Sequence, residues 1–135
     1  MASTTYTIQD GDRTAIMRFT HDSGAEAAVN KVIVANLNAS ARGQACTGVK
    51  ISKIDFMTES HGIELYWEAT VPVLAAALPK DYADQLDFAS FGGLFNNAAA
   101  AGKTGNISFT TAGSTKYVVV LHLIKSYYEH SNGIR

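Results

Sequence analysis

The sequence predicts an all-β protein, a single-domain antiparallel β-sandwich or jelly-roll-like fold with one long loop and at most one short helix. Short runs of β-branched and aromatic residues alternate with clusters of Gly, Asn, Asp and Ser, which is the pattern of strands and turns. The chain of 135 residues has the length of one domain, and 47% of its residues are hydrophobic, enough for a core without disulfides. The long helical crossovers that a parallel sheet requires are not evident. We therefore expect about seven to nine antiparallel strands in one domain spanning residues 1–135.

In the first third of the chain, residues 13–20 follow a turn signal and alternate in polarity. Ala15, Met17 and Phe19 fall on one face, so this segment reads as a half-buried strand. Residues 27–37 are expected to form a second strand built on Val29 and its apolar neighbours. A helix is the alternative there, because the preceding Ala-Glu-Ala-Ala favours helix formation.

The middle and end of the chain supply the remaining strands. Residues 49–57 form a strand, a turn covers 59–62, and residues 63–70 place Ile63, Leu65 and Trp67 on one face as the hairpin partner of that strand. Residues 71–78 are apolar between Pro72 and Pro79, which indicates an edge strand. Residues 107–111 and 116–125 complete the set.

The expected core combines one face of each strand. It comprises Met17, Phe19, Val32, Val34, Ile51, Ile54, Leu65, Trp67, Ile107, Phe109, Val118, Val120 and Leu123.

The long connection at residues 81–105 is the most informative segment for function. Loops longer than about 12–15 residues in a compact domain are usually functional. Its apolar residues would make a large exposed patch if all of them stayed in water, and such patches mark interaction sites. The alternative is that the aromatic residues close one end of the sandwich. The interface candidates are Phe88, Phe91, Leu94, Phe95, Asn96 and Asn97.

No residue pattern points to catalysis, to a cofactor or to a metal. The net charge of −1 does not favour nucleic acid or an anionic membrane as a partner. Cys46 is the only cysteine and reads as a buried hydrophobe, and the histidines lack the spacing of a zinc site. The Gly-Lys-Thr at residues 102–104 has Asn97 where a phosphate-binding loop needs glycine. We therefore expect no enzyme.

Export and membrane insertion are not expected either. The N-terminal residues lack the basic start and apolar run of a secretory signal. The longest apolar stretch, residues 117–124, is much shorter than the ~20 residues of a membrane-spanning helix. These features indicate a soluble protein made in a cytoplasm.

Several segments together carry a resemblance that covers most of the chain. They are residues 10–20, 49–54, 65–70, 91–97, 102–113 and 117–121. In these segments and their order, the chain resembles small virion structural proteins of tailed double-stranded DNA phages, and most of all a capsid decoration (cement) protein.

The resemblance implies a non-enzymatic protein that binds the shell of the major capsid protein and stabilises it. Its partners would be that protein and copies of itself, with a homotrimer favoured, on the capsid surface of a virion assembled in the host cytoplasm. Residues 1–9 and 126–135 would be arm-like termini. Two alternatives stay open: a tail-tube, connector or baseplate subunit, and a carbohydrate-binding β-sandwich module using aromatic residues such as Tyr66 and Trp67.

Overall fold

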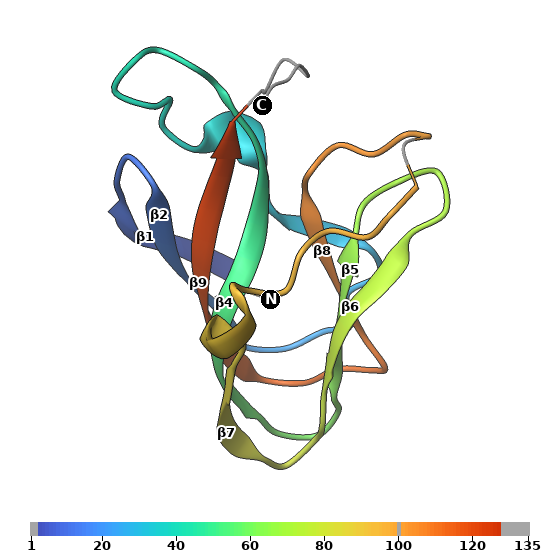
Figure 1. Cartoon of the computed structure of the whole chain (residues 1–135). Helices are drawn as coiled ribbons and strands as arrows, with labels where there is room; N and C mark the ends of the chain where they lie inside the picture. Colours follow the sequence, from blue (N-terminus) through green and yellow to red (C-terminus); the bar gives the residue numbers. More distant parts are fainter. Residues whose placement is uncertain (1–2, 100, 128–135) are drawn as a thin grey trace.

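Two antiparallel β-sheets make up the protein (Figure 1). The computed structural model describes residues 3–99 and 101–127. The five-stranded sheet has the order β1-β2-β9-β4-β7 and the four-stranded sheet the order β3-β8-β5-β6. The strands are β1 (Ser3–Asp10), β2 (Thr14–His21), β3 (Val29–Val32), β4 (Cys46–Thr58), β5 (Ile63–Trp67), β6 (Val73–Leu78), β7 (Ala83–Asp87), β8 (Ile107–Thr111) and β9 (Tyr117–Tyr127). The predicted all-β sandwich is confirmed.

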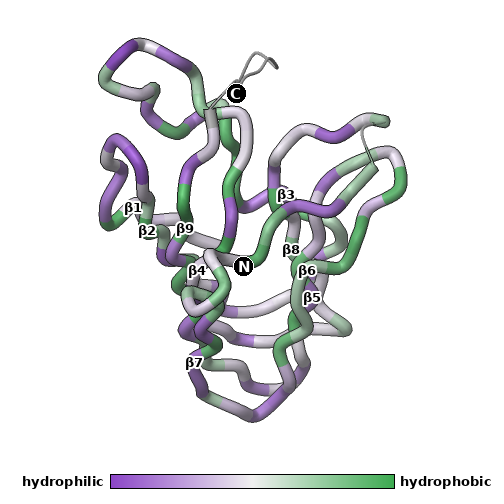
Figure 2. The backbone as a smooth tube through the Cα atoms, in the orientation of Figure 1, coloured by the Kyte–Doolittle hydropathy of each residue, from purple (hydrophilic) through white to green (hydrophobic). Residues whose placement is uncertain are grey.

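The core lies between the two sheets and is built from the buried residues of the strands other than β1 and β7. In β2 and β5 the buried residues recur at every second position, which is the period of a strand with one face covered. Phe19 of the five-stranded sheet packs edge-on against Phe109 of the other, with ring centroids 5.3 Å apart. Trp67 is fully buried. In Figure 2 the turn between β1 and β2 and the chain around β7 are mostly hydrophilic.

Eleven of the thirteen expected core residues are buried, and Val118 and Val120 are the exceptions. The buried apolar positions of β9 are Tyr117, Val119, Leu121 and Leu123, so the two valines lie on the outer face of the sheet. Because the run from Tyr117 to Leu121 is apolar throughout, its sequence carries no alternation that could distinguish the two faces.

The expected hairpin between residues 49–57 and 63–70 is wrong. β4 pairs with β9 and β7, whereas β5 pairs with β6 and β8 in the other sheet. The turn between β4 and β5 therefore carries the chain from one sheet to the other. The edge position expected for residues 71–78 is confirmed by β6.

Three further segments differ from expectation. Residues 83–87 of the long connection form β7, which pairs with β4. Within residues 27–37, the strand is only β3, and a single 3-10 turn, η1 (Val34–Asn36), follows it. Residues expected in an N-terminal arm form β1 from Ser3 onward, paired with β2. The expected C-terminal arm begins within β9, and its residues 128–135 lie outside the described residues.

Candidate functional site

The candidate interface residues divide into an inward and an outward set. Phe88 and Leu94 are half-buried and pack against the core. Phe91 and Phe95 are 65% and 64% exposed. This segment therefore carries two aromatic side chains outward while two other apolar side chains anchor it to the sandwich.

A local backbone path explains the division. Phe88 is followed by the single 3-10 turn η2 (Ala89–Phe91) and by Gly92 and Gly93, whose φ angles are +86° and +102°. Left-handed φ values favour glycine, and two in succession reverse the chain. The Gly93 N–H donates to the Phe88 carbonyl at 3.0 Å, which closes the turn. Phe91 is left at the outside of this reversal.

The segment is tied to β4 where β7 ends. The Phe88 N–H donates to the Ser52 carbonyl at 2.8 Å. Leu94 and Ile51 exchange two backbone hydrogen bonds of 2.8 and 3.0 Å, forming an isolated antiparallel bridge. Leu94 thus occupies the edge of β4 beyond the reach of β7.

The far end of the segment is held by Glu68, directly after β5. Its carboxylate accepts hydrogen bonds from the Thr104 hydroxyl at 2.6 Å and from the side-chain amides of Asn30 and Asn106, both at 3.0 Å. The Thr104 hydroxyl first, and the two amides with it, hold the pKa of Glu68 below its ordinary value. The two exposed phenylalanines are therefore carried by a segment fixed at both ends.

Asn96 and Asn97 have different environments. The Asn96 side-chain oxygen accepts the Ala98 N–H at 2.9 Å, a local turn contact, while Asn97 is exposed. A shallow depression of about 280 Å³ lies beside Phe95 and Asn96, with Lys50 and Lys103 also in its lining.

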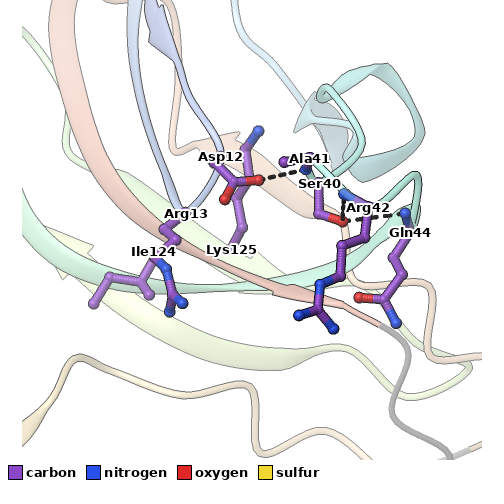
Figure 3. A pocket seen from close by; sticks show the side chains of 8 residues that line it. All are labelled: Asp12, Arg13, Ser40, Ala41, Arg42, Gln44, Ile124 and Lys125. Atoms are coloured by element: carbon purple, nitrogen blue, oxygen red, sulfur yellow. Dashed lines mark hydrogen bonds between the residues drawn. The ribbon is translucent and has the colours of Figure 1, made fainter.

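A second cavity, of about 490 Å³, lies between the β1–β2 turn and residues 40–44 (Figure 3). Arg13 and Arg42 both line it. The Ser40 hydroxyl accepts the backbone N–H groups of Arg42 and Gln44 at 3.2 and 3.1 Å, so it shapes the loop. Asp12 accepts the Ala41 N–H at 2.7 Å. These polar contacts shape the cavity wall and do not assemble a nucleophile with a base.

Sequence reasoning missed a buried ionic cluster at one end of the sandwich. Glu26 accepts hydrogen bonds from the Lys31 ammonium and the Tyr117 hydroxyl, both at 2.6 Å. The His21 ring stacks on Tyr117, and its Nδ1 lies 3.7 Å from the Glu26 carboxylate. The signal in the sequence was a lysine among the β-branched apolar residues of 29–34.

The ionic state of this cluster follows from its partners. Burial raises the pKa of Glu26, but the hydrogen bonds from Lys31 and Tyr117 outweigh burial and hold that pKa below its ordinary value. Burial, and then the Glu26 carboxylate, raise the pKa of the Tyr117 phenol far above its ordinary value. The cluster joins residues of β2, β3 and β9 to the loop that carries Glu26, and its charged side chains are buried.

The other candidate reactive groups are scattered. His61 contacts the Ser114 carbonyl through Nδ1 at 3.0 Å, and His122 lies 3.3 Å from Asp55. His130 lies outside the described residues. Cys46 is buried, and burial raises the pKa of its thiol.

The described residues contain neither a metal-binding cluster nor a membrane-spanning helix. In residues 3–99 and 101–127, three or more His, Cys, Asp or Glu side chains nowhere gather into a group that could hold a metal ion. Within the same ranges, no helix has the length and apolar character needed to cross a membrane.

The aromatic residues considered for sugar binding do not share one surface. Trp67 is in the core and Tyr66 is half-buried, with its hydroxyl donating to Glu64 at 2.8 Å. Trp67 therefore cannot serve as a sugar-stacking platform.

Comparison with known proteins yields no match to a family model, to a curated protein or to a solved structure.

Proposed function

We propose that this protein is a non-enzymatic structural subunit of a tailed-phage virion, a capsid decoration protein that binds the shell of the major capsid protein through Phe91 and Phe95. The observation that carries the proposal is the exposure of both rings on a segment anchored at each end. The assignment to a phage virion rests on the sequence resemblance. The expected setting is the capsid surface, after assembly in the host cytoplasm.

The physical case rests on preorganisation. Large aromatic side chains are frequent hot spots of protein interfaces. Binding costs less when they are already held in place, because little backbone freedom is then lost. The bridge between Leu94 and Ile51 and the contacts of Glu68 with Thr104 provide this constraint. A cement protein needs such a fixed contact and needs no active site.

The test is the double substitution Phe91→Ser with Phe95→Ser. Circular dichroism and thermal unfolding report folding, and co-sedimentation with undecorated shells reports binding. We expect a folded protein whose affinity falls by roughly thirty-fold or more, which corresponds to a loss of about 2 kcal/mol for the two substitutions together.

The matched control is Val71→Ser with Leu74→Ser, which removes two exposed apolar side chains, one just before β6 and one within it. This control should bind shells normally. If the phenylalanine variant folds and decorates shells with unchanged occupancy, the proposed surface is wrong. A reconstructed particle that shows the protein as rings along the tail would assign it to the tail instead.

A further inference from the structure

The edges of the two sheets differ in how they are protected. In the described residues the edge strands are β1 and β7 of one sheet and β3 and β6 of the other. An edge strand presents unpaired N–H and C=O groups that can pair with another chain. Natural proteins guard such edges with charges, prolines, short strands or buried charged side chains.

Three of these edges carry such protection. β7 has Asp84 and Asp87 among its five residues. β3 has four residues and places the buried charge of Lys31 next to its edge. β6 is bracketed by Pro72 and Pro79, which cannot donate a backbone hydrogen bond.

β1 is the exception. It has eight residues, no proline or glycine, and no charge before Asp10. Every residue from Ser3 to Gln9 is exposed, including Tyr6 at 61% and Ile8 at 49%. Its composition of Thr, Tyr and Ile strongly favours strands. Its one protective feature is a bulge between Thr7 and Gln9, which leaves residues 3–7 in regular register.

The strand is also fixed at both ends. The Lys31 ammonium donates to the Ser3 hydroxyl at 2.6 Å. At the other end the buried ammonium of Lys125 pairs with Asp10. β1 lies at the outer margin of its sheet in Figure 1. A partner strand would therefore meet an edge that is already ordered, which lowers the entropic cost of pairing.

We infer that β1 pairs antiparallel with β1 of a second copy of this chain, joining the two five-stranded sheets across a two-fold axis. The second copy fits because residues 3–9 are uncharged: self-pairing sets no like charges opposite each other, and no charge selects a different partner. Cross-strand pairs of Thr with Thr or Tyr stabilise antiparallel sheets.

Such a contact is closed, because the same edge is used by both copies. Pairing along a single strand buries less than a standard interface, so we expect a dimer that forms at high protein concentration. The inference rests on the edge of β1 alone and not on the virion proposal. A trimer would have to use another surface.

Sedimentation velocity over a range of concentrations tests the contact. The wild-type chain should shift toward twice the monomer mass, and Thr5→Lys should weaken dimerisation by about tenfold or more, since it brings like charges together at the paired edge. Thr14→Lys is the matched control: Thr14 is exposed on β2, an interior strand, so dimerisation should be unchanged.

A cysteine scan tests the geometry independently of whether Thr5→Lys folds. Single cysteines replace Thr4, Thr5, Tyr6 or Thr7 in a Cys46→Ala background, with Ala83→Cys on β7 as the control edge. A two-fold antiparallel pairing sets one residue opposite its own copy, so oxidation should cross-link one of the four positions far more than the control. A monomer at all concentrations without position-specific cross-linking overturns the inference, as does a dimer that Thr5→Lys leaves intact. Shell binding is measured separately, so either proposal can fail alone.

Discussion

Glu26 and Glu68 each accept hydrogen bonds from three side chains, yet their surroundings differ. The Glu26 side chain is 6% exposed and accepts hydrogen bonds from a buried ammonium, from a phenol and from the Ser3 hydroxyl at 3.4 Å. Glu68 is only partly buried, and its donors are a hydroxyl and two amides, all neutral. Glu26 therefore belongs to an ion pair that is shielded from water, whereas Glu68 is a single charge close to solvent.

The difference shows what each carboxylate does for the fold. Near water, a broken hydrogen bond is largely replaced by solvent, so the net contribution of each bond is small. In the interior, removing one partner leaves the other charge without compensation. Glu26 therefore contributes to global stability, whereas Glu68 contributes to the position of the segment that carries Phe91 and Phe95.

The largest effect should come from Glu26→Gln. It leaves the Lys31 ammonium buried without its counter-charge, and we expect a loss of about 3–5 kcal/mol in the free energy of unfolding measured with urea. The double variant Glu26→Gln with Lys31→Met should recover much of this loss, because neither partner is then charged. A loss below about 1 kcal/mol for Glu26→Gln would remove the distinction between the two sites.

Glu68→Gln should have a smaller effect, about 1 kcal/mol on global unfolding, since it weakens hydrogen bonds near solvent. Its local effect should be clearer. Amide hydrogen exchange should accelerate around Thr104, whose N–H donates to the Glu68 carbonyl at 3.3 Å, and remain unchanged in β9. Equal acceleration throughout the sandwich would show that Glu68 acts globally.

The smallest expected effect is on the free energy of unfolding at acid pH. The pKa values of Glu26 and Glu68 are both lowered in the folded protein. The unfolded chain therefore binds these protons more readily, so the stabilisation is complete only when the pH is well above the ordinary Glu pKa of about 4.3, and it is lost as the pH falls through the folded-state values. Urea unfolding at a series of pH values should show each Glu→Gln variant with a flatter acid limb than the wild type. A steeper limb in either variant would contradict the lowered pKa.

The local alternation of apolar and polar residues was sufficient to identify strands that have one buried face. In β2 and β5 strict alternation identified both the strand and its buried residues. It could not do so for β9, where Val118 and Val120 are as apolar as the buried Val119. β7 escaped notice because an edge strand exposed along most of its length needs no apolar alternation, and its sequence Ala-Asp-Gln-Leu-Asp has none.

The candidate surface was found in part. The sequence pointed to this segment because four large apolar residues lie close together in a long, glycine-containing connection. It could not show that Phe88 and Leu94 turn inward while Phe91 and Phe95 stay outside. That division depends on the left-handed Gly92 and Gly93 and on an edge of β4 that β7 leaves open.

By itself, the sequence determined the all-β class and most of the core, because alternation and turn residues act over a few neighbouring positions. Only the tertiary structure decided which strands share a sheet. β4 and β5 are separated by four residues and yet lie in different sheets, while β9 reaches back to pair with both β2 and β4. It also decided that Glu26, Lys31 and Tyr117 meet, and that β1 is the least protected edge among the described strands. These outcomes depend on contacts between residues far apart in the chain, which local periodicity does not record.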